Sequence, residues 1–263
     1  MSILGLVTPV WNGYRGVPGS TWFEQAIKSG ISNMRDGYKY LILDNGSDDG
    51  TFEYLSKIAI ENNLYILRTP SKLGLCPSLN IAIDILNCKY FAPLSSDDIM
   101  PDGHLERCVN YMEEHQDVVM CGGAPIWIDD NNNNLDLYSP NQTAPKTVDL
   151  WYEALINGQC FNVGPVYRTD VIKKLGKFDE TTNPTAGEDY DMYMKICERG
   201  LPIKIFDEPG YYTRMRSSLR PSLSDNHQAL DMQVAASFNS MKSRVGNIAK
   251  RLRAIREGNV FNV

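Results

Sequence analysis

Two apolar stretches of the sequence end abruptly in carboxylates. Residues 40–43 are followed by Asp44, and residues 90–94 are followed, after two serines, by Asp97 and Asp98. Both stretches have the length of a strand. Because open α/β sheets bind ligands at the carboxyl ends of their strands, these two acidic strand ends predict a polar ligand, with or without a metal ion, at the edge of a sheet.

Asp44 precedes a segment of turn-forming residues that ends at Gly50. One interpretation is that these residues only form a turn, which Asp, Asn and Gly do readily. A turn does not explain why an acid ends an apolar strand. A carboxylate in that place can accept the imide N–H of a uracil or thymine ring, and we favour this second interpretation.

Asp97 and Asp98 repel each other unless a cation or hydrogen-bond donors hold them. Carboxylate oxygens suit Mg²⁺ or Mn²⁺, which proteins usually bind through one or two carboxylates and the phosphates of a substrate. The alternative is a helix cap, where aspartate is favoured. We expect Asp97 to be the ligand, and Asp98 and Asp102 to serve the following helix.

A third acidic group, Glu188 and Asp189, lies where a loop ending in Gly187 meets a helical pattern. Paired acids at a helix start can be partners of the helix dipole and nothing more. An acid at such a junction can also face a cleft and act as a general base. The histidines have no spacing that suits a metal site, and we expect them to be surface or structural residues.

Composition sets limits on the class of protein. With 263 residues, 43% of them apolar, the chain can form one large α/β core or two modest ones. A net charge of −6 argues against nonspecific nucleic-acid binding, so no nucleic-acid partner is expected. The six cysteines form no C-x-x-C pair, no signal peptide is recognisable, and no apolar run approaches bilayer length. We expect a cytoplasmic protein with reduced cysteines.

Apolar periodicity predicts alternating strands and helices in the first half, and therefore a mainly parallel sheet with right-handed crossovers. The expected strands are 3–10, 38–43, 64–67, 90–94 and 118–121. The expected helices begin at Thr21, at Thr51 as N-cap, after the loop 72–78, and at Asp102 as N-cap. Further on we expect a turn at 129–134, helices at 148–156, 185–199 and 228–256, a strand at 201–206 and a loop from Asp207 to Asp225.

Several segments follow one another in an order known from one enzyme family. They are VTPVWN (7–12), LDNGSDDGT (43–51), GLCPSLN (74–80), LSSDD (94–98), VYR (166–168), GKFDE (176–180) and EDYD (188–191). From about residue 6 to residue 224 the chain thus resembles the family 2 glycosyltransferases. The resemblance implies an α/β fold of GT-A type: a mainly parallel open sheet flanked by helices, with a smaller acceptor-side region and a C-terminal helical segment.

The resemblance also implies an activity. This is the inverting transfer of a single sugar from a UDP- or dTDP-linked donor to a hydroxyl of a glycan, lipid-linked or protein acceptor. Asp189 would be the catalytic base, with Glu188 orienting it or binding the acceptor, and Asp97 would bind Mn²⁺ or Mg²⁺ at the diphosphate. The residues implied in nucleotide-sugar binding are Thr8, Pro9, Val10, Asn12, Asp44, Lys72, Gly74, Asn80, Ser96, Asp97 and Arg216.

Two residues depart from the family pattern. Ser95 stands where the first acid of the D-x-D motif usually lies, so the metal would have one carboxylate ligand and more water. Arg216 stands where relatives often have a histidine, and its cation could neutralise phosphate charge directly. We therefore expect metal dependence to be weaker than is usual in the family. The Q-x-x-R-W signature of processive synthases is absent from the sequence, which favours transfer of one sugar.

We expect residues 1–225 to form the glycosyltransferase domain, with a nucleotide-binding half at about 1–124 and an acceptor-side half at about 125–225. Residues 226–263 would form a helical extension whose apolar stripe lies beside several basic residues. One interpretation is that the stripe packs on the domain. The other is a peripheral contact with anionic lipid at the inner face of the membrane.

Two other classes of protein fit part of the pattern. A nucleotidyltransferase also uses acids and a divalent ion, but it would normally show a basic, glycine-rich phosphate loop after the first strand. Here Arg15 is the only basic residue between positions 11 and 20. A catalytically inactive nucleotide-sugar-binding module would not need the pair Glu188 and Asp189, although Ser95 is compatible with it.

Overall fold

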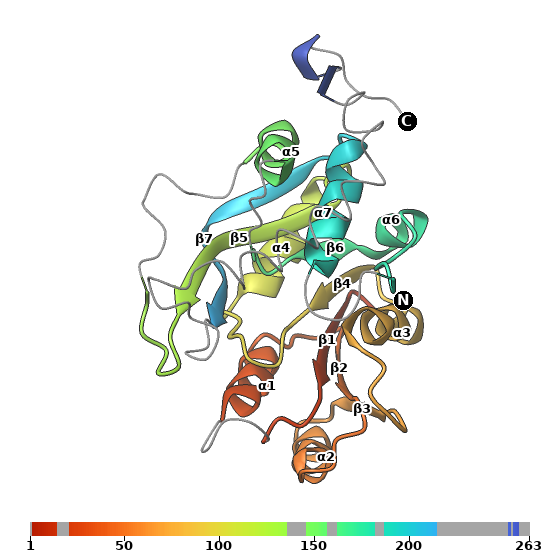
Figure 1. Cartoon of the computed structure of the whole chain (residues 1–263), viewed down its shortest axis with the longest axis vertical. Coiled ribbons are helices and arrows are strands. Elements are labelled where there is room, and N and C mark those ends of the chain that lie inside the picture. The colour runs from red at the N-terminus through yellow and green to blue at the C-terminus, as the bar shows by residue number, and fades with distance from the viewer. Residues whose placement is uncertain are drawn as a thin grey trace.

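The computed structural model describes residues 2–14, 21–135, 146–156, 162–181, 187–214, 252–253 and 255–257. Within these residues, seven strands form one sheet with helices on both faces (Figure 1). The strands are β1 (Leu4–Val10), β2 (Tyr38–Asp44), β3 (Tyr65–Arg68), β4 (Tyr90–Pro93), β5 (Met120–Ile128), β6 (Val166–Arg168) and β7 (Ile203–Arg214). The helices are α1 (Trp22–Ser32), α2 (Thr51–Glu61), α3 (Leu75–Leu86), α4 (His104–Glu114), α5 (Val148–Ile156), α6 (Thr169–Lys174) and α7 (Glu188–Glu198).

The strand order is β3-β2-β1-β4-β6-β5-β7. Neighbouring strands run parallel, except that β6 is antiparallel to both β4 and β5. The expectation of a mainly parallel open sheet is confirmed. Val10 is the register partner of Asp44, and Val7 is the partner of Pro93. The loops that follow β1, β2 and β4 therefore leave the same edge of the sheet.

Alternation along the strands divides the core into two layers. In β2, Leu41 and Leu43 belong to one cluster of buried residues, and Tyr40 and Ile42 belong to the other. Helices α3, α5, α6 and α7 cover the first cluster, and α1, α2 and α4 cover the second. Side chains that alternate in this way pack on both faces of a strand, as expected for a parallel sheet between two helical layers.

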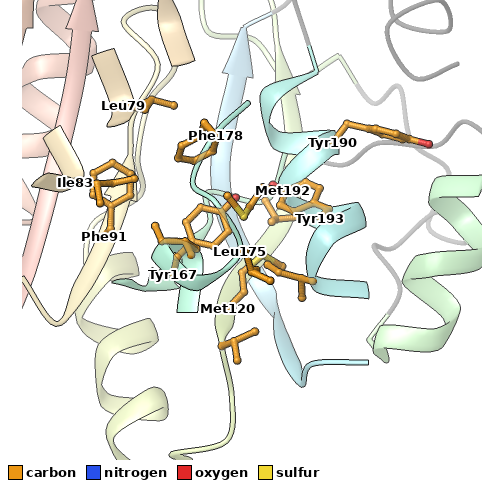
Figure 2. Packing of buried hydrophobic residues seen from close by; sticks show 14 of the residues in the cluster. Leu79, Ile83, Phe91, Met120, Tyr167, Leu175, Phe178, Tyr190, Met192 and Tyr193 are labelled. Carbon is orange, nitrogen blue, oxygen red and sulfur yellow. The ribbon is translucent and has the colours of Figure 1, made fainter. Parts of the chain in front are cut away.

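The first cluster joins the two halves of the chain. Figure 2 shows Ile83 of α3 and Phe91 of β4 on one side of it, and Tyr167 of β6 and Tyr193 of α7 on the other. Phe178 lies between them, with its ring centroid 6.4 Å from that of Phe91 and 6.2 Å from that of Tyr167. β6, Phe178 and α7 are therefore packed directly against α3 and β4.

Two predicted helix caps are wrong. The N-cap residues of α2 and α4 are Gly50 and Gly103, with φ of 91° and 75°, in place of Thr51 and Asp102. Glycine is favoured there because side chains disfavour positive φ. The Thr51 hydroxyl donates to the Asp49 carboxylate at 2.6 Å, and Asp102 accepts a hydrogen bond from the hydroxyl of Ser32.

In the second half, α5, α7 and the turn after β5 were predicted, whereas β6 and α6 were not. The predicted loop from Asp207 is wrong for residues 207–214, because β7 continues to Arg214 beside β5. Residues 215–225 lie outside the described residues. Five of the six cysteines are described, and each is a buried thiol.

Candidate functional site

Asp44 ends β2 with its side chain fully buried. Its Oδ2 accepts the N–H of Ser47 at 3.2 Å and lies 3.3 Å from Nε of Arg68. Its Oδ1 is also buried and has no hydrogen-bond partner among the described residues. A buried acceptor without a donor costs about 1–3 kcal/mol. This oxygen therefore keeps an unused capacity to accept a hydrogen bond.

The loop after β1 is fastened to the loop after β2. The N–H of Asn12 donates to Oγ of Ser47 at 2.9 Å, and Oδ1 of Asn12 accepts the N–H of Asp48 at 3.0 Å. Asn12 has a φ of 49°, which asparagine tolerates better than most residues. These two bonds fasten the segment that follows Asp44 to the loop after β1.

Other residues predicted for nucleotide binding lie along the same strand end. Trp11 is 46% exposed, and Nζ of Lys72 lies 3.5 Å from the centroid of its ring. Pro9 is half-buried. Thr8 is fully buried, and its hydroxyl bonds that of Tyr40 at 2.8 Å, within the core layer covered by α1. Trp11 and Lys72 can therefore reach a ligand, whereas Thr8 lies beneath the strand end.

The second acidic strand end divides into an interior acid and an outer one. Asp98 is 3% exposed, and it accepts the backbone N–H of Arg214 at 2.8 Å and the side-chain amide of Asn162 at 3.2 Å. Burial, with the charge of Asp97 as a second cause, raises the pKa of Asp98 to about 7. Asp97 and Ser96 are half-buried, and Ser95 is exposed. Asp97 is thus the acid of this pair that is better placed to meet a ligand.

Arg214, the last residue of β7, was missed by the sequence analysis. Its Nε donates to the carbonyl oxygen of Asp97 at 2.9 Å. The sequence singled out Arg216, two residues further along, which lies outside the described residues. The signal that could have indicated Arg214 is an arginine at the end of a strand, but it lies 117 positions from Asp97, beyond the reach of any local pattern.

Glu188 and Asp189 form the first turn of α7, after Gly187 with a φ of 112°. Burial, with the charge of Asp189 as a second cause, raises the pKa of Glu188 to about 8. Oδ1 of Asp189 accepts the N–H of Tyr190 at 2.7 Å. Asp191, which is 1% exposed, forms an ion pair with Lys195 at 2.7 Å, so this third acid serves the helix itself.

Two buried tyrosines lie between the acid pairs. Burial, followed by the charge of Asp98, raises the pKa of Tyr211, and the hydroxyl of Tyr211 donates to the carbonyl of Pro93. Burial, followed by the charge of Asp189, raises the pKa of Tyr167, and Tyr211 contributes to the same shift. Tyr211 is therefore within electrostatic range of Asp98, and Tyr167 is within range of Asp189.

Gly74 and Asn80 were predicted to bind the nucleotide sugar. Gly74 is the N-cap of α3, with a φ of 101°. The Asn80 amide donates to the carbonyl of Phe178 at 2.9 Å and to Glu180 at 2.8 Å, and its oxygen accepts the N–H of Phe178 at 3.0 Å. Asn80 thus ties α3 to the segment that precedes α7, and its role in donor binding stays a prediction.

The donor set for a metal ion is small. Among the described residues, no three His, Cys, Asp or Glu side chains gather into a metal site. At the strand end, Asp98 already accepts hydrogen bonds from Arg214, Asn162 and Ser95, and Asp97 is the acid that the sequence analysis expects as the ligand. Such a set fits Mg²⁺ or Mn²⁺ only together with substrate phosphates and water. His104 is structural, as expected, with Nε2 2.6 Å from the carbonyl oxygen of Gly164.

Most of the predicted C-terminal helix lies outside the described residues. Leu252 and Ile255, which belong to its apolar stripe, are partly buried against the first core cluster. Arg253 is exposed and forms an ion pair with Glu257 at 2.8 Å. These contacts favour packing on the domain over a lipid contact. Among the described residues, no helix is long and apolar enough to cross a membrane.

Comparison of the sequence with protein-family models finds a match over residues 6–176 to the family described as Glycosyl transferase family 2. An uncharacterised glycosyltransferase of Haemophilus influenzae is 22% identical over 189 residues, which cover 68% of this chain and 57% of that protein. Another, from Rickettsia prowazekii, is 25% identical over 198 residues, which cover 74% of this chain and 58% of that protein. The chain therefore spans a little over half the length of these relatives.

The fold also has counterparts among solved structures. S. aureus TarS 1-349 in complex with UDP has a TM-score of 0.65 at 16% identity, covering 96% of this chain and 71% of that one. The complex of the same protein with UDP-GlcNAc has a TM-score of 0.65 at 18% identity, covering 90% and 67%. At such identities the similarity concerns the fold alone, and it confirms the expected GT-A type architecture.

Proposed function

The chain belongs to the family 2 glycosyltransferases, and on that premise we propose that it transfers a single sugar from a nucleoside-diphosphate sugar to an acceptor hydroxyl, with inversion at the anomeric carbon. The acceptor would be a hydroxyl of a glycan, a lipid-linked saccharide or a protein. The observation that carries the proposal is the buried, unpartnered carboxylate oxygen of Asp44 at a strand end, beside an exposed tryptophan.

Asp44 would recognise the base. Uracil and thymine carry an N3–H that can donate to Oδ1 of Asp44, whereas the purine adenine has no donor at the equivalent ring nitrogen. Trp11 offers an exposed ring on which a base or ribose can stack, and Lys72 lies over that ring. TarS, which shares the fold, has been solved with UDP and with UDP-GlcNAc. We therefore propose a UDP- or dTDP-linked donor.

Asp97 would lie at the diphosphate. The half-buried Asp97 carboxylate would hold Mn²⁺ or Mg²⁺ together with the donor phosphates. The ion would supply electrophilic stabilisation of the charge that develops on the departing nucleoside diphosphate. Arg216, which lies outside the described residues, would add a positive charge at the same phosphates. This second source of charge supports a metal dependence that is weaker than usual for the family.

Asp189 would be the general base. The acceptor hydroxyl attacks the anomeric carbon from the face opposite the diphosphate, forming the new C–O bond as the bond to phosphate oxygen breaks. The hydroxyl proton passes to the Asp189 carboxylate. The raised pKa of Glu188 favours a proton on that neighbour at neutral pH. One displacement of this kind inverts the anomeric centre and needs no covalent intermediate.

A donor panel tests the proposal. Release of nucleoside diphosphate would be measured with UDP-, dTDP-, GDP- and ADP-sugars, and the affinity of each free nucleotide would be measured by calorimetry. We expect binding and turnover with uridine or thymidine donors. Tighter binding of GDP than of UDP and dTDP would overturn the base assignment. Binding without release would indicate an inactive module, and release of pyrophosphate would indicate a nucleotidyltransferase.

The variant Asp44→Asn sharpens this test, because it replaces one carboxylate oxygen with a donor that cannot accept the imide N–H. We expect about a tenfold loss of UDP affinity, since that factor corresponds to about 1.4 kcal/mol. Asp49→Asn is the matched control. It makes the same charge change in the same loop, where the Asp49 carboxylate accepts the N–H of Thr51 and the N–H of Tyr14. Its UDP affinity should stay within about twofold of the parent.

A further inference from the structure

The Arg214 guanidinium is the meeting point of three segments that are far apart in the sequence. Arg214 is 5% exposed. Its Nε donates to the carbonyl of Asp97 at 2.9 Å, and Nη1 donates to the carbonyl of Asp129 at 2.7 Å. Its Nη2 donates to Oδ1 of Asn132 at 2.6 Å and to Oε1 of Gln25 at 3.1 Å. One side chain thus joins the acidic strand end to α1 and to residues 129–134, named here the asparagine turn.

The asparagine turn is held in one shape by its own bonds. Oδ1 of Asp129 accepts the N–H groups of Asn131 and Asn133, each at 2.8 Å. Trp22 of α1 donates from Nε1 to the carbonyl of Asp130 at 3.2 Å. Acceptors that are fixed in this way leave the guanidinium little freedom. Because guanidinium donors form a rigid planar fork, their four acceptors determine where the fork lies.

The charge of Arg214 is directed at the acids without pairing with them. The acceptors of its guanidinium are carbonyl and amide oxygens, which are neutral. Its backbone N–H, in contrast, donates to Oδ1 of Asp98 at 2.8 Å. Arg214 is thus joined to both acids by different groups. Its guanidinium donates to the main chain of Asp97, and its backbone N–H donates to the carboxylate of Asp98.

We infer that Arg214 is a positioning residue for donor binding: its guanidinium, fixed by the asparagine turn and α1, holds the main chain of Asp97 so that the Asp97 carboxylate meets the donor diphosphate. The inference rests on the proposed function, because it needs Asp97 to act at that diphosphate. It assigns a role to the asparagine turn, which carries no ligand-binding pattern of its own. Asn132 acts on the ligand indirectly, because it fixes Arg214, which in turn holds Asp97.

Arg168 provides a matched comparison. It is also buried, at 9% exposure, and its guanidinium also donates to carbonyl oxygens, those of Val118 and Met112. Its other acceptors are the carbonyl of His115 and the hydroxyl of Tyr90, at the start of β4, each at 3.5 Å. None of these acceptors belongs to an acidic strand end. A change of Arg168 to lysine therefore disturbs a guanidinium of the same kind without touching Asp97.

The test is the affinity for UDP by calorimetry, measured without divalent ions and with saturating Mn²⁺. The dissociation constant without divalent ions, divided by that with Mn²⁺, is named here the Mn²⁺ ratio. It reports how much the metal ion at the diphosphate and Asp97 strengthens UDP binding. We expect Arg214→Lys to reduce that ratio by about tenfold, because lysine cannot reproduce the fork. UDP affinity without Mn²⁺ should remain within about twofold of the parent, since Asp44 is not touched. Arg168→Lys should leave both affinities unchanged even if it lowers the unfolding temperature.

A second variant serves if Arg214→Lys does not fold. Asn132 has a φ of 68°, so Asn132→Gly removes the amide that fixes the guanidinium and keeps the backbone unstrained. We expect it to reduce the Mn²⁺ ratio by about threefold, and Asn131→Ala, at a neighbouring residue, to leave the ratio unchanged.

The parent protein separates the two ways in which the test can fail. If Mn²⁺ does not strengthen UDP binding to the parent, the role of Asp97 in the proposed function is wrong, and the inference falls with it. If Mn²⁺ strengthens UDP binding to the parent and equally to Arg214→Lys or Asn132→Gly, the inference alone is overturned. An equal loss of the ratio in Arg168→Lys would also overturn it, because the effect would then be one of general stability.

Discussion

The fold contains two pairs of adjacent acids, and in each pair one acid has a raised pKa. The two pairs lie on different elements. Asp97 and Asp98 follow a strand, and Glu188 and Asp189 form the first turn of a helix. In each pair, burial and the charge of the neighbour raise the pKa of one acid, to about 7 for Asp98 and to about 8 for Glu188. Each pair thus contains one acid whose protonated form the fold favours.

The two pairs differ in the groups that donate hydrogen bonds to the acid whose pKa is raised. Asp98 is bonded by two segments that are distant in the sequence, through Asn162 and the backbone of Arg214. Glu188 accepts backbone bonds of its own helix start, from Gly187 and its own N–H. The proposed function would use the strand-end pair to hold the diphosphate and the helix-start pair to accept a proton.

The largest effect should come from a change of Asp189. We expect Asp189→Asn to lower kcat by about a thousandfold, because the isostere removes the proton acceptor and keeps the volume. The dissociation constant of UDP should be unchanged, which calorimetry would check. Substantial transfer by this variant at neutral pH would show that Asp189 is not the base and that Glu188 or another acid accepts the proton.

A smaller loss is expected at the outer acid of the strand-end pair. Asp97→Ala should lower turnover by about tenfold or more, because the developing charge on the diphosphate loses part of its support. Asp102→Ala is the control, since that carboxylate bonds the hydroxyl of Ser32 on the surface and should leave turnover unchanged. Transfer by Asp97→Ala at the parental rate, with the same Mn²⁺ dependence, would show that the pair does not hold the diphosphate.

The inner acid of the strand-end pair should affect stability more than chemistry. Asp98→Ala leaves the N–H of Arg214 and the amide of Asn162 without an acceptor in the interior. We expect the free energy of unfolding to fall by about 1–3 kcal/mol, and Asp102→Ala to lower it by less than about 1 kcal/mol. Urea titration followed by circular dichroism measures both. Equal stability of the two variants would remove the structural role assigned to Asp98.

The sequence alone predicted the parts of the fold that repeat a period. The strands from β1 to β4 and most helices were recognised from their apolar residues. β5 was recognised only at its start, because it continues to Ile128 whereas the expected strand ended at 121. β6 and α6 are only three and six residues long, too short for a period to be seen. In β7 the apolar pattern is interrupted at residues 207–210. The strand continues there because it pairs with β5 through two register shifts, which no local pattern contains.

The candidate site was predicted to a similar extent. Asp44, Asp97 and the α7 acids stand out because each acid follows a strand or starts a helix. Their partners could not be found in this way. Arg68 lies 24 positions after Asp44, and Arg214 lies 116 positions after Asp98. These contacts exist because sheet order, not sequence order, decides which loops meet.

The last prediction concerns Glu188 and the pH dependence of stability. The folded state raises the pKa of Glu188 from 4.5 to about 8, so between these values the folded protein holds a proton that the unfolded chain releases. The folded state therefore loses stability relative to the unfolded chain as pH rises through this range. Glu188→Gln is neutral at every pH and should lack this loss. Its unfolding temperature, minus that of the parent, should increase from about pH 5 to about pH 8.5. Asp98 is present in both proteins, so its own raised pKa cancels in the difference. If this difference in unfolding temperature did not change with pH, Glu188 would be ionised in the folded state. The raised pKa assigned to Glu188 would then be wrong.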